Sequence, residues 1–579
     1  MSEKFFSEKV MLADTLLKEG PYRNTHDVVE RISRLVPDNR ILAELNRNGN
    51  IVHYTARELY NEVMSLGNGL LEAGLGGAHI AIIAPNSCRY VIADLCISSG
   101  VGVVVPMDRD LPSQLMAELL NRCDADAVIC GSLYLHGIEE ILPSCPRIRT
   151  VITLDRKVEG YAYYEELIES GRSFSTGDGS FASSPYCMRE LDPHAAAKII
   201  FTSGTTGANK AVVLSNANLS ANIDNCLGSI RAEKFNTSMS VLPMHHSVEI
   251  NTHIMTRVAS GRLTYICGEM RNLMRCLKIF KPTVITVVPM IATAFYRNIW
   301  QNARKEGKDE KLMKGIRISN FLRRFGIDRT RSMFASIHEV FGGNLHMLVC
   351  GGSMLNPVVV KGLNDIGIRV ENGYGITECG PLISINANTL KDHLSVGKPC
   401  ENIEVKILDP DSNGVGELCV RGANVAKGYY KDPENTSKVF YSDGFFNTGD
   451  SASISADGKI HLAGRKKNAI VLSNGKNILP EEIENVIESN MDYAADIVVY
   501  KVEHKGQELL CAGLYIPDEQ MRSNVERISE DIRKINSLMP SYKCIDYVEL
   551  PECEYEKTSS RKIKRNLLPQ SISGKSIAI

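Results

Sequence analysis

Residues 198–210 read KIIFTSGTTGANK. The apolar start of this stretch predicts a buried strand, which runs into a loop of hydroxyls and glycines that ends in Lys210. Glycines let backbone amides approach a phosphate closely, and the hydroxyls and the lysine add donors and charge. The spacing is not that of the Walker loop, in which Gly-Lys precedes Ser or Thr. The residues alone therefore leave a phosphate site and a flexible turn as alternatives.

Before this stretch, predicted helices alternate with short apolar strands. Thr55 and Glu58 have the spacing of a capping box at the start of a helix with one apolar side. Strands are expected at 79–84 and 101–105, with a helix between them. Such alternation favours parallel sheets covered by helices. The Gly- and Ser-rich segment 171–187 is expected to be a linker.

After this stretch, a strand at 284–288 continues the pattern, and short β-rich runs from 401 to 420 indicate a small β subdomain. Beyond residue 467 the pattern becomes a compact mixture of helices and strands. The predicted fold class is α/β. A large domain over 1–466 is expected to hold layered, mostly parallel sheets with helices and the β subdomain, and a small α+β domain is expected over 467–579.

The composition excludes several classes of protein. A chain of 579 residues is long for one core, and its 44% hydrophobic and 23% charged residues are ordinary for a globular protein. The net charge of −2 argues against a nucleic-acid partner. The 16 cysteines show no zinc spacing, no signal peptide is recognised, and no apolar run is long enough for a membrane helix. These features predict a cytoplasmic location.

The segment 201–219, FTSGTTGANKAVVLSNANL, resembles the signature loop of the adenylate-forming superfamily, which includes acyl-CoA synthetases, luciferases and peptide-synthetase adenylation domains. Three residues depart from the usual pattern: Asn209 replaces Pro, Ala211 replaces Gly and Asn216 replaces His. The resemblance implies that this loop contacts the β- and γ-phosphates of ATP. The contacts that it implies are Thr202, Ser203, Gly204, Thr205, Thr206, Gly207 and Lys210.

Further motifs follow in the order of that superfamily. The run NGYGITE, residues 372–378, is similar to its adenine and magnesium segment. The resemblance implies that Tyr374 stacks on adenine beside Gly375, that Thr377 touches the α-phosphate, and that Glu378 holds Mg²⁺. A hard divalent cation favours carboxylate and phosphate oxygens. Taken alone, the run is more typical of a loop with an exposed glutamate.

Two later segments fit the same family. Asp450, in a Thr-Gly-Asp run, matches the carboxylate that accepts the ribose hydroxyls, and Arg465 is expected beside it. Lys467 falls at the position about which the small domain of relatives rotates between two half-reactions. Gly475 matches the lining of the pantetheine tunnel, which implies coenzyme A as a co-substrate. Without the family, the run GRKK would be a solvated basic segment.

Lys562 lies in the basic run KTSSRKIKR, residues 557–565, and aligns with the catalytic lysine of the family. Arg561 stands where the family usually has Gly. A basic run near a chain end is more often simply solvated. The catalytic role is implied because the run follows the expected hinge at the family's distance.

The acyl site is implied by two segments. His246 corresponds to the residue that gates carboxylate entry, and glycines in the run 351–353 would leave room for an acyl chain. Outside the family, His246 is equally well explained as a partly buried histidine. No acidic residue is placed to capture an amino group, which favours a plain fatty acid.

The segment 297–331 holds eleven Lys or Arg against four Asp or Glu, with apolar residues interleaved. Its placement resembles that in bacterial long-chain acyl-CoA synthetases. Peripheral contact with an anionic membrane surface, at the inner face, is one interpretation. A solvated helical hairpin packed on the body is the simpler one.

The resemblance therefore implies an acid–thiol ligase that forms AMP. With ATP and Mg²⁺ it would adenylate a medium- or long-chain fatty acid and then transfer the acyl group to the thiol of coenzyme A. A ligase that loads an acyl carrier protein is the nearest alternative. A non-catalytic AMP-binding sensor on the same scaffold is another, although it would need neither a hinge nor a mobile lysine.

Overall fold

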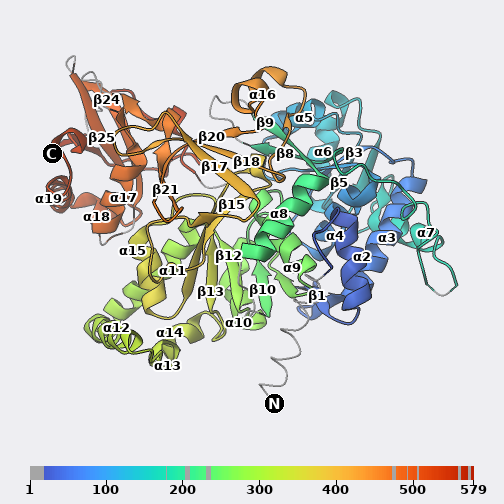
Figure 1. The fold of residues 1–579 in the computed structure, drawn as a ribbon, viewed down its shortest axis with the longest axis horizontal. Helices are drawn as coiled ribbons and strands as arrows, with labels where there is room; N and C mark the ends of the chain where they lie inside the picture. Colours follow the sequence, from blue (N-terminus) through green and yellow to red (C-terminus); the bar gives the residue numbers. More distant parts are fainter. Residues whose placement is uncertain are drawn as a thin grey trace.

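The structure is a computed structural model in which the small carboxyl-terminal part lies beside one end of a larger body (Figure 1). It describes residues 19–177, 179–202, 209–229, 236–471, 477–491, 493, 495–504, 507–557, 562–571 and 576–579.

The larger body contains two extended sheets. The first sheet has nine described strands, and their order in space differs from their order along the chain. The connections between neighbouring parallel strands therefore contain crossover helices. The spatial order of the strands is β16 (Lys398–Pro399), β15 (Leu382–Asn386), β14 (Arg369–Gly375), β13 (Met347–Cys350), β12 (Val284–Val287), β10 (Thr237–Ser240), β11 (Leu263–Ile266), β1 (Arg40–Leu45) and β2 (Ile51–Thr55).

The second sheet has eight described strands and carries the stretch 198–210. Its centre is parallel, whereas β8 and β9 form an antiparallel pair in which Thr202 faces Lys210. The spatial order is β19 (Gly428–Tyr429), β9 (Lys210–Ser215), β8 (Ala196–Thr202), β4 (Val103–Pro106), β3 (His79–Ile83), β5 (Ala127–Cys130), β6 (Thr150–Thr153) and β7 (Ala162–Tyr163).

Helices cover both faces of these sheets. On β3, Ile80 and Ile82 pack into the core that holds α3 and α4, whereas Ala81 and Ile83 pack towards α5 and α6. Because strand side chains alternate between faces, a strand buried on both sides is apolar throughout. The helices of the second sheet are α2 (Thr25–Leu35), α3 (Ala56–Glu72), α4 (Cys88–Cys96), α5 (Ser113–Arg122), α6 (Leu135–Ile141), α7 (Tyr164–Arg172), α8 (Asn216–Ser229) and α9 (Met255–Ala259).

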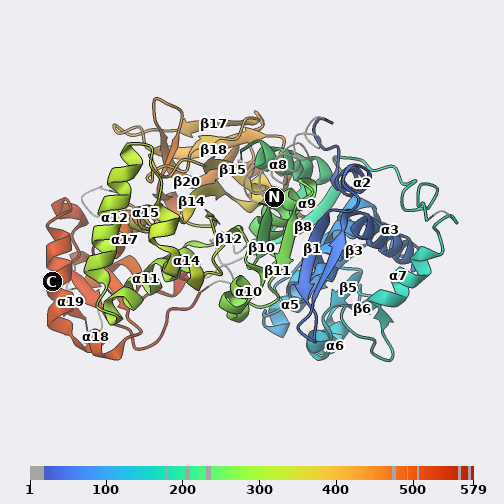
Figure 2. The same cartoon turned by 90° about the horizontal axis from the view of Figure 1, so that it is seen from below.

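A separate core lies between the first sheet and the helices on its outer face (Figure 2). Residues of β12 and β13 meet α10, α11 and α15 there. Strand β12 ends before Pro289, which opens α11 as its sequence position predicts. The outer helices are α10 (Leu273–Phe280), α11 (Pro289–Lys305), α12 (Asp309–Arg324), α13 (Thr330–Met333), α14 (Ala335–Val340) and α15 (Pro357–Asp365).

The β subdomain and the carboxyl-terminal domain complete the α/β fold. The subdomain is an antiparallel sheet of β17 (Ile403–Leu408), β18 (Gly416–Gly422), β20 (Phe446–Ile454) and β21 (Ile460–Arg465), with α16 (Pro433–Val439) nearby. The small domain has its own core. Its elements are β22 (Ile470–Val471), β23 (Asn477–Ile478), α17 (Pro480–Asn490), β24 (Asp496–His504), β25 (Gln507–Tyr515), α18 (Glu519–Ser523), α19 (Val525–Asn536), β26 (Tyr547–Glu549) and β27 (Ile577–Ala578).

Local sequence signals act as expected at the start of α3. The Thr55 side chain accepts the backbone N–H of Glu58 at 3.2 Å, and the Glu58 carboxylate accepts the backbone N–H of Thr55 at 2.7 Å. This reciprocal pair is the predicted capping box.

The expectation of a linker at 171–187 is wrong. Tyr186 is fully buried, and its hydroxyl donates to the carbonyl oxygen of Cys96 at 2.7 Å. A Cβ added at Gly67 would lie 2.5 Å from the Tyr186 ring, and Gly100 also faces that ring. Tyr186 therefore anchors the end of this segment in the core, because glycines far away in the sequence leave room for its aromatic side chain.

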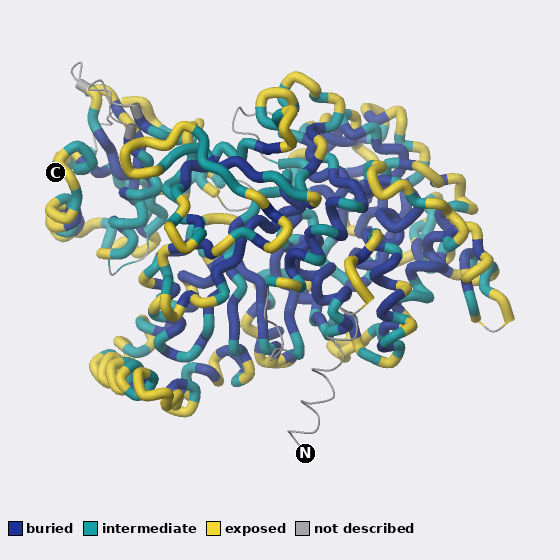
Figure 3. Tube along the Cα trace, in the orientation of Figure 1, coloured by how far each residue is buried: buried dark blue, intermediate teal, exposed yellow. Residues whose placement is uncertain are grey.

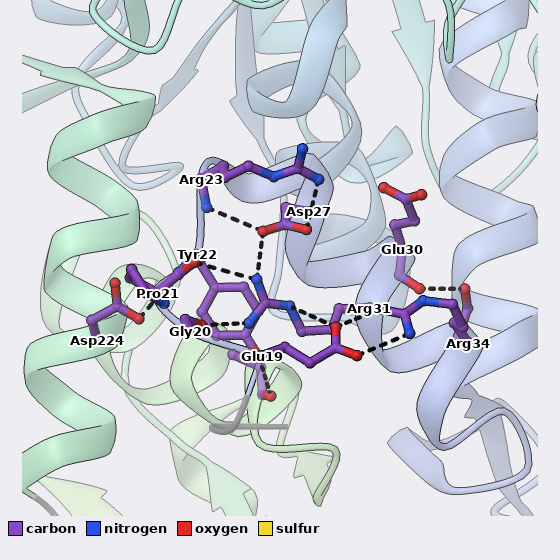
Figure 4. A network of polar contacts seen from close by, with 12 residues as sticks. Glu19, Gly20, Pro21, Tyr22, Arg23, Asp27, Glu30, Arg31, Arg34 and Asp224 are labelled. Atoms are coloured by element: carbon purple, nitrogen blue, oxygen red, sulfur yellow. Dashed lines mark hydrogen bonds and ion pairs between the residues drawn. The ribbon is translucent and has the colours of Figure 1, made fainter. Parts of the chain in front are cut away.

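A polar network anchors the first described residues (Figure 4). Arg31 of α2 donates to Asp27 at 2.8 Å, and its guanidinium lies 4.1 Å from the centroid of the Tyr22 ring. The Tyr22 hydroxyl donates to the carbonyl oxygen of Ala259 at 2.7 Å, and its backbone N–H donates to Asp224 of α8. The network thus joins α2 to α8 and α9.

None of the helices in the described ranges is both long and apolar enough to cross a bilayer.

Candidate active site

The phosphate-loop segment begins at the end of β8 and ends where β9 starts. The half-buried Thr202 and Lys210 lie opposite each other on these two strands. The other predicted phosphate contacts, Ser203, Gly204, Thr205, Thr206 and Gly207, lie outside the described residues.

Glu378 lies on a single helical turn that follows β14, and buried asparagines hold that turn in place. Asn424 donates from Nδ2 to the carbonyl oxygens of Cys379 and Leu382, at 2.5 and 2.9 Å. Asn222 of α8 accepts the backbone N–H of Leu382 at 2.9 Å. Buried backbone groups need such partners, and here they fix the position of the Glu378 backbone.

Tyr429 of β19 connects Glu378 to Lys210. Its hydroxyl donates to Glu378 Oε1 at 2.9 Å, and Lys210 Nζ lies 3.4 Å from the same hydroxyl and 4.7 Å from the ring centroid. Burial and the Glu378 charge raise the pKa of Tyr429, so the phenol stays protonated and can donate. The sequence interpretation missed this residue. The aromatic pair at 429–430, after the glycine of β19, is the one signal that could have pointed to it.

Asp450 is the centre of a second group. The Tyr374 hydroxyl donates to its Oδ2 at 2.8 Å, and Arg465 Nε donates to its Oδ1 at 3.0 Å from the neighbouring strand β21. A carboxylate offers about four acceptor positions, so Asp450 keeps capacity for ligand hydroxyls. Gly375 ends β14 where an added Cβ would lie 2.1 Å from the carbonyl oxygen of Pro381. Only glycine fits at that point.

Two lysines bring the carboxyl-terminal domain into the same site. Lys562 keeps contact with solvent but lies among many protein atoms, so desolvation lowers its pKa to about 8, with a further decrease from Arg465 and an opposing effect of Asp450. The pKa of Lys467 is also lowered to about 8, first by desolvation and then by Arg465, Lys210 and Lys562. Positive charges from both domains therefore lie close enough to influence each other.

The predicted gate segment reaches the same region. The hydroxyl of Ser247 lies 3.0 Å from the hydroxyl of Thr377. The neighbouring His246 ring packs on that of His245, with centroids 4.1 Å apart. Burial, His246 and Arg109 hold the pKa of His245 well below its usual range, so its ring is neutral.

The predicted pocket wall at 351–353 follows β13. A Cβ built at Gly351 would lie 3.5 Å from the carbonyl oxygen of Gly373, which is ordinary contact. Gly351 and Gly373 have no positive φ, so their backbone conformation does not require glycine, whereas Gly352 has a positive φ. A methyl group would therefore fit at either Gly351 or Gly373 in ordinary van der Waals contact.

The described residues place one carboxylate, Glu378, where the sequence predicts a metal ligand, and they contain no cluster of three His, Cys, Asp or Glu side chains. This donor set fits Mg²⁺, which is commonly held by one or two carboxylates together with substrate phosphates and water. Gly475, the predicted tunnel residue, lies outside the described residues. The structure thus groups Lys210, Glu378, Tyr374, Asp450, Arg465, Lys467 and Lys562, and their roles remain predictions.

Comparison with known families identifies two matching domains. Residues 30–430 match the model of the AMP-binding enzyme family, and residues 467–571 match the carboxyl-terminal domain of AMP-binding enzymes. The chain belongs to the AMP-binding enzyme family.

Among curated relatives, the peroxisomal long chain acyl-CoA synthetase 6 of Arabidopsis thaliana is 30% identical over 459 residues, which cover 73% of this chain and 63% of that protein. Long-chain-fatty-acid–CoA ligase 6 of Homo sapiens is 28% identical over 500 residues, which cover 80% of this chain and 69% of that protein. The chain thus spans about two thirds of the length of these relatives.

Solved structures share the fold at lower identity. ATP-bound MatB from Rhodopseudomonas palustris superposes with a TM-score of 0.72 at 20% identity, covering 94% of this chain and 98% of that one. The A domain of carboxylic acid reductase from Segniliparus rugosus, in complex with AMP and a carboxylic acid, gives 0.77 at 17% identity, covering 96% and 93%. These likenesses establish the adenylate-forming fold, with a large amino-terminal and a smaller carboxyl-terminal domain.

Proposed function

We propose that this protein is an ATP-dependent, AMP-forming ligase that joins a fatty acid to the thiol of coenzyme A. The observation that carries the proposal is the convergence of Lys210, Arg465, Lys467 and Lys562 from both domains around Asp450. Desolvation by burial, followed by the neighbouring positive charges, lowers the pKa values of Lys467 and Lys562, and a bound polyphosphate would favour their charged forms.

In the first half-reaction, a carboxylate oxygen of the fatty acid attacks the α-phosphorus of ATP. The bond to the bridging oxygen breaks, and pyrophosphate leaves with the electron pair. Both reactants are anionic, so catalysis consists of positioning and charge stabilisation. Lys562 would bridge the reacting oxygens, and Lys210 would hold the departing phosphates. Mg²⁺, when bound by Glu378 and phosphate oxygens, would neutralise further negative charge.

In the second half-reaction, the thiol attacks the carbonyl carbon of the acyl-adenylate. The carbon–oxygen bond to phosphate breaks, and AMP leaves. No protein nucleophile is required because the mixed anhydride is already activated. Rotation of the small domain at Lys467 would withdraw Lys562 between the two steps.

Substrate class is inferred from the relatives and from the site. The curated relatives are named for long-chain fatty acids, and the run 351–353 resembles a wall of the acyl pocket in that family. Coenzyme A is favoured over a carrier protein by the same names. Thioester assays with free coenzyme A and with a carrier protein would separate the two acceptors.

The test is Lys562→Gln, assayed for each half-reaction. Loss of this charge should lower ATP–pyrophosphate exchange by about 10²–10³-fold, or roughly 3–4 kcal/mol. Thioester formation from preformed acyl-AMP should be nearly unchanged. Lys564→Gln, which removes an exposed lysine that pairs with Glu556, is the matched control. Equal loss in both half-reactions would contradict the proposal, and absence of exchange in the wild type across a panel of fatty acids would favour the sensor.

A further inference from the structure

The outer side of α12 carries apolar side chains that the rest of the described chain leaves uncovered. Ile318, Phe321 and Phe325 are exposed by 54%, 59% and 67%, and their spacing of three and four residues places them on one side of the helix. The two phenyl rings contact each other, with centroids 5.1 Å apart. Apolar side chains grouped on a surface in this way indicate a contact site.

The opposite side of α12 is fixed to the body, so the apolar side points outward. Asn320 Nδ2 donates to Asp365 Oδ1 at 3.0 Å, and Arg323 donates to the carbonyl oxygen of Asn364 at 3.2 Å, both on α15. The Ser319 hydroxyl lies 2.8 Å from that of Thr330 at the start of α13. Figures 1 and 3 show α12 at the edge of the molecule, with much of its length exposed.

Basic side chains surround the apolar group. Lys311, Arg317, Arg324 and Arg329 are exposed, and within the described part of the chain none of them has a carboxylate partner. Lys314 has only a 4.0 Å contact with Glu310 on its own helix. The whole chain has a net charge of −2, so this concentration of positive charge is local. The surface therefore suits a partner that is both apolar and anionic.

We propose that α12 is a docking surface for an anionic lipid bilayer. Ile318, Phe321 and Phe325 enter the boundary between headgroups and acyl chains, and the basic side chains contact the headgroups. A second copy of this chain fits less well. A symmetric pair would place the same basic face against itself, and like charges would repel.

The proposed docking surface is smaller than the segment 297–331, for which the sequence suggested either membrane contact or a hairpin packed on the body. Helix α11 buries Ile291, Phe295 and Ile299 against the first sheet, so the hairpin is packed on the body, as the simpler interpretation states. The outer side of α12 remains exposed in this hairpin. If the proposed function holds, the contact would bring the enzyme to the phase in which fatty acids dissolve.

The test is co-flotation of the full chain with vesicles, without nucleotide. Wild type should float with vesicles containing phosphatidylglycerol and not with pure phosphatidylcholine, and binding should weaken with salt. The variant Ile318→Ser/Phe321→Ser/Phe325→Ser and the variant Lys311→Glu/Lys314→Glu/Arg317→Glu should each lower binding at least about tenfold, given the usual contribution of each basic residue.

The matched control is Leu133→Ser/Met188→Ser/Leu538→Ser, which removes three exposed apolar side chains elsewhere on the protein. It should bind as the wild type does, and all variants should keep the wild-type unfolding midpoint. Unchanged binding by both α12 variants, no flotation of the wild type, or a dimer that the serine variant converts to a monomer would overturn the proposal. A chain that floats but exchanges no pyrophosphate would contradict the proposed function alone.

Discussion

At the scale of single residues, the carboxyl group of Glu371 on β14 is fully buried, 3.2 Å from Arg369. Burial raises its pKa from 4.5 to about 7, and Arg369 opposes the increase. Between pH 4.5 and 7 the folded state therefore binds more protons than the unfolded state, so stability falls as the pH rises. Glu371→Gln should flatten this dependence and stabilise the protein above pH 7 by about 3 kcal/mol at most.

Urea unfolding midpoints at pH 5 and pH 8 measure this effect. The matched control is Glu404→Gln, which changes an exposed carboxyl that pairs with Arg421. If wild type and Glu371→Gln lose the same stability between the two pH values, the buried carboxyl is not the cause.

The glycine pair at the pocket wall gives a second prediction at this scale. Gly351→Ala adds a methyl group at ordinary contact distance from Gly373, so stability should change little. If Gly351 lines the acyl pocket, kcat/KM should shift towards shorter acids by about tenfold, the usual value of one methylene in a pocket. Gly352→Ala is the contrasting variant, because φ is +90° there and the left-handed conformation costs about 1–2 kcal/mol. An unchanged chain-length profile in Gly351→Ala would place the acyl chain elsewhere.

At the scale of elements, β19 contributes Tyr429 to a site otherwise built from β9 and the turn after β14. Tyr429→Phe removes the hydrogen bond to Glu378 and the contact with Lys210. A lost hydrogen bond to a charged group costs about 1.5–3 kcal/mol, so the KM for MgATP should rise about tenfold or more. Tyr430→Phe is the matched control, since its hydroxyl donates to the distant Asp124. Similar KM values in both variants would show that Tyr429 does not position Glu378.

The elements also show what sequence alone can predict. Strand β3 and helix α3 follow from signals within a few residues: an apolar run and the pair Thr55 and Glu58. The burial of Tyr186 depends on Gly67 and Gly100, which are distant in the chain. The local composition of 171–187 does not contain this information, and its glycines and serines indicated a linker instead. The same limit applies in the site. Glu378 and Lys210 stand in recognisable motifs, whereas the link through Tyr429 exists only once β19 pairs with β9.

At the scale of the whole molecule, Lys467 and Lys562 belong to one charged group formed by two domains. Their pKa values of about 8 mean that both lose charge as the pH rises through 8. An anion favours the charged form, so binding of pyrophosphate should take up protons near pH 8–9 and weaken as the pH increases. Calorimetry in buffers of different ionisation enthalpy measures this uptake. In Lys562→Gln the uptake should fall by about half, whereas an unchanged value would exclude Lys562 from the anion site.

The hydrogen bonds of Asn222 and Asn424 hold the turn of Glu378 within the large domain. Both asparagines belong to the large domain, so the turn keeps its place whatever the small domain does. If rotation of the small domain moves Lys562 away after the first half-reaction, the nucleotide would stay bound to the large domain. The acyl-adenylate could then stay bound to the large domain while the small domain rotates. It would not have to move to a second site before the thiol reacts.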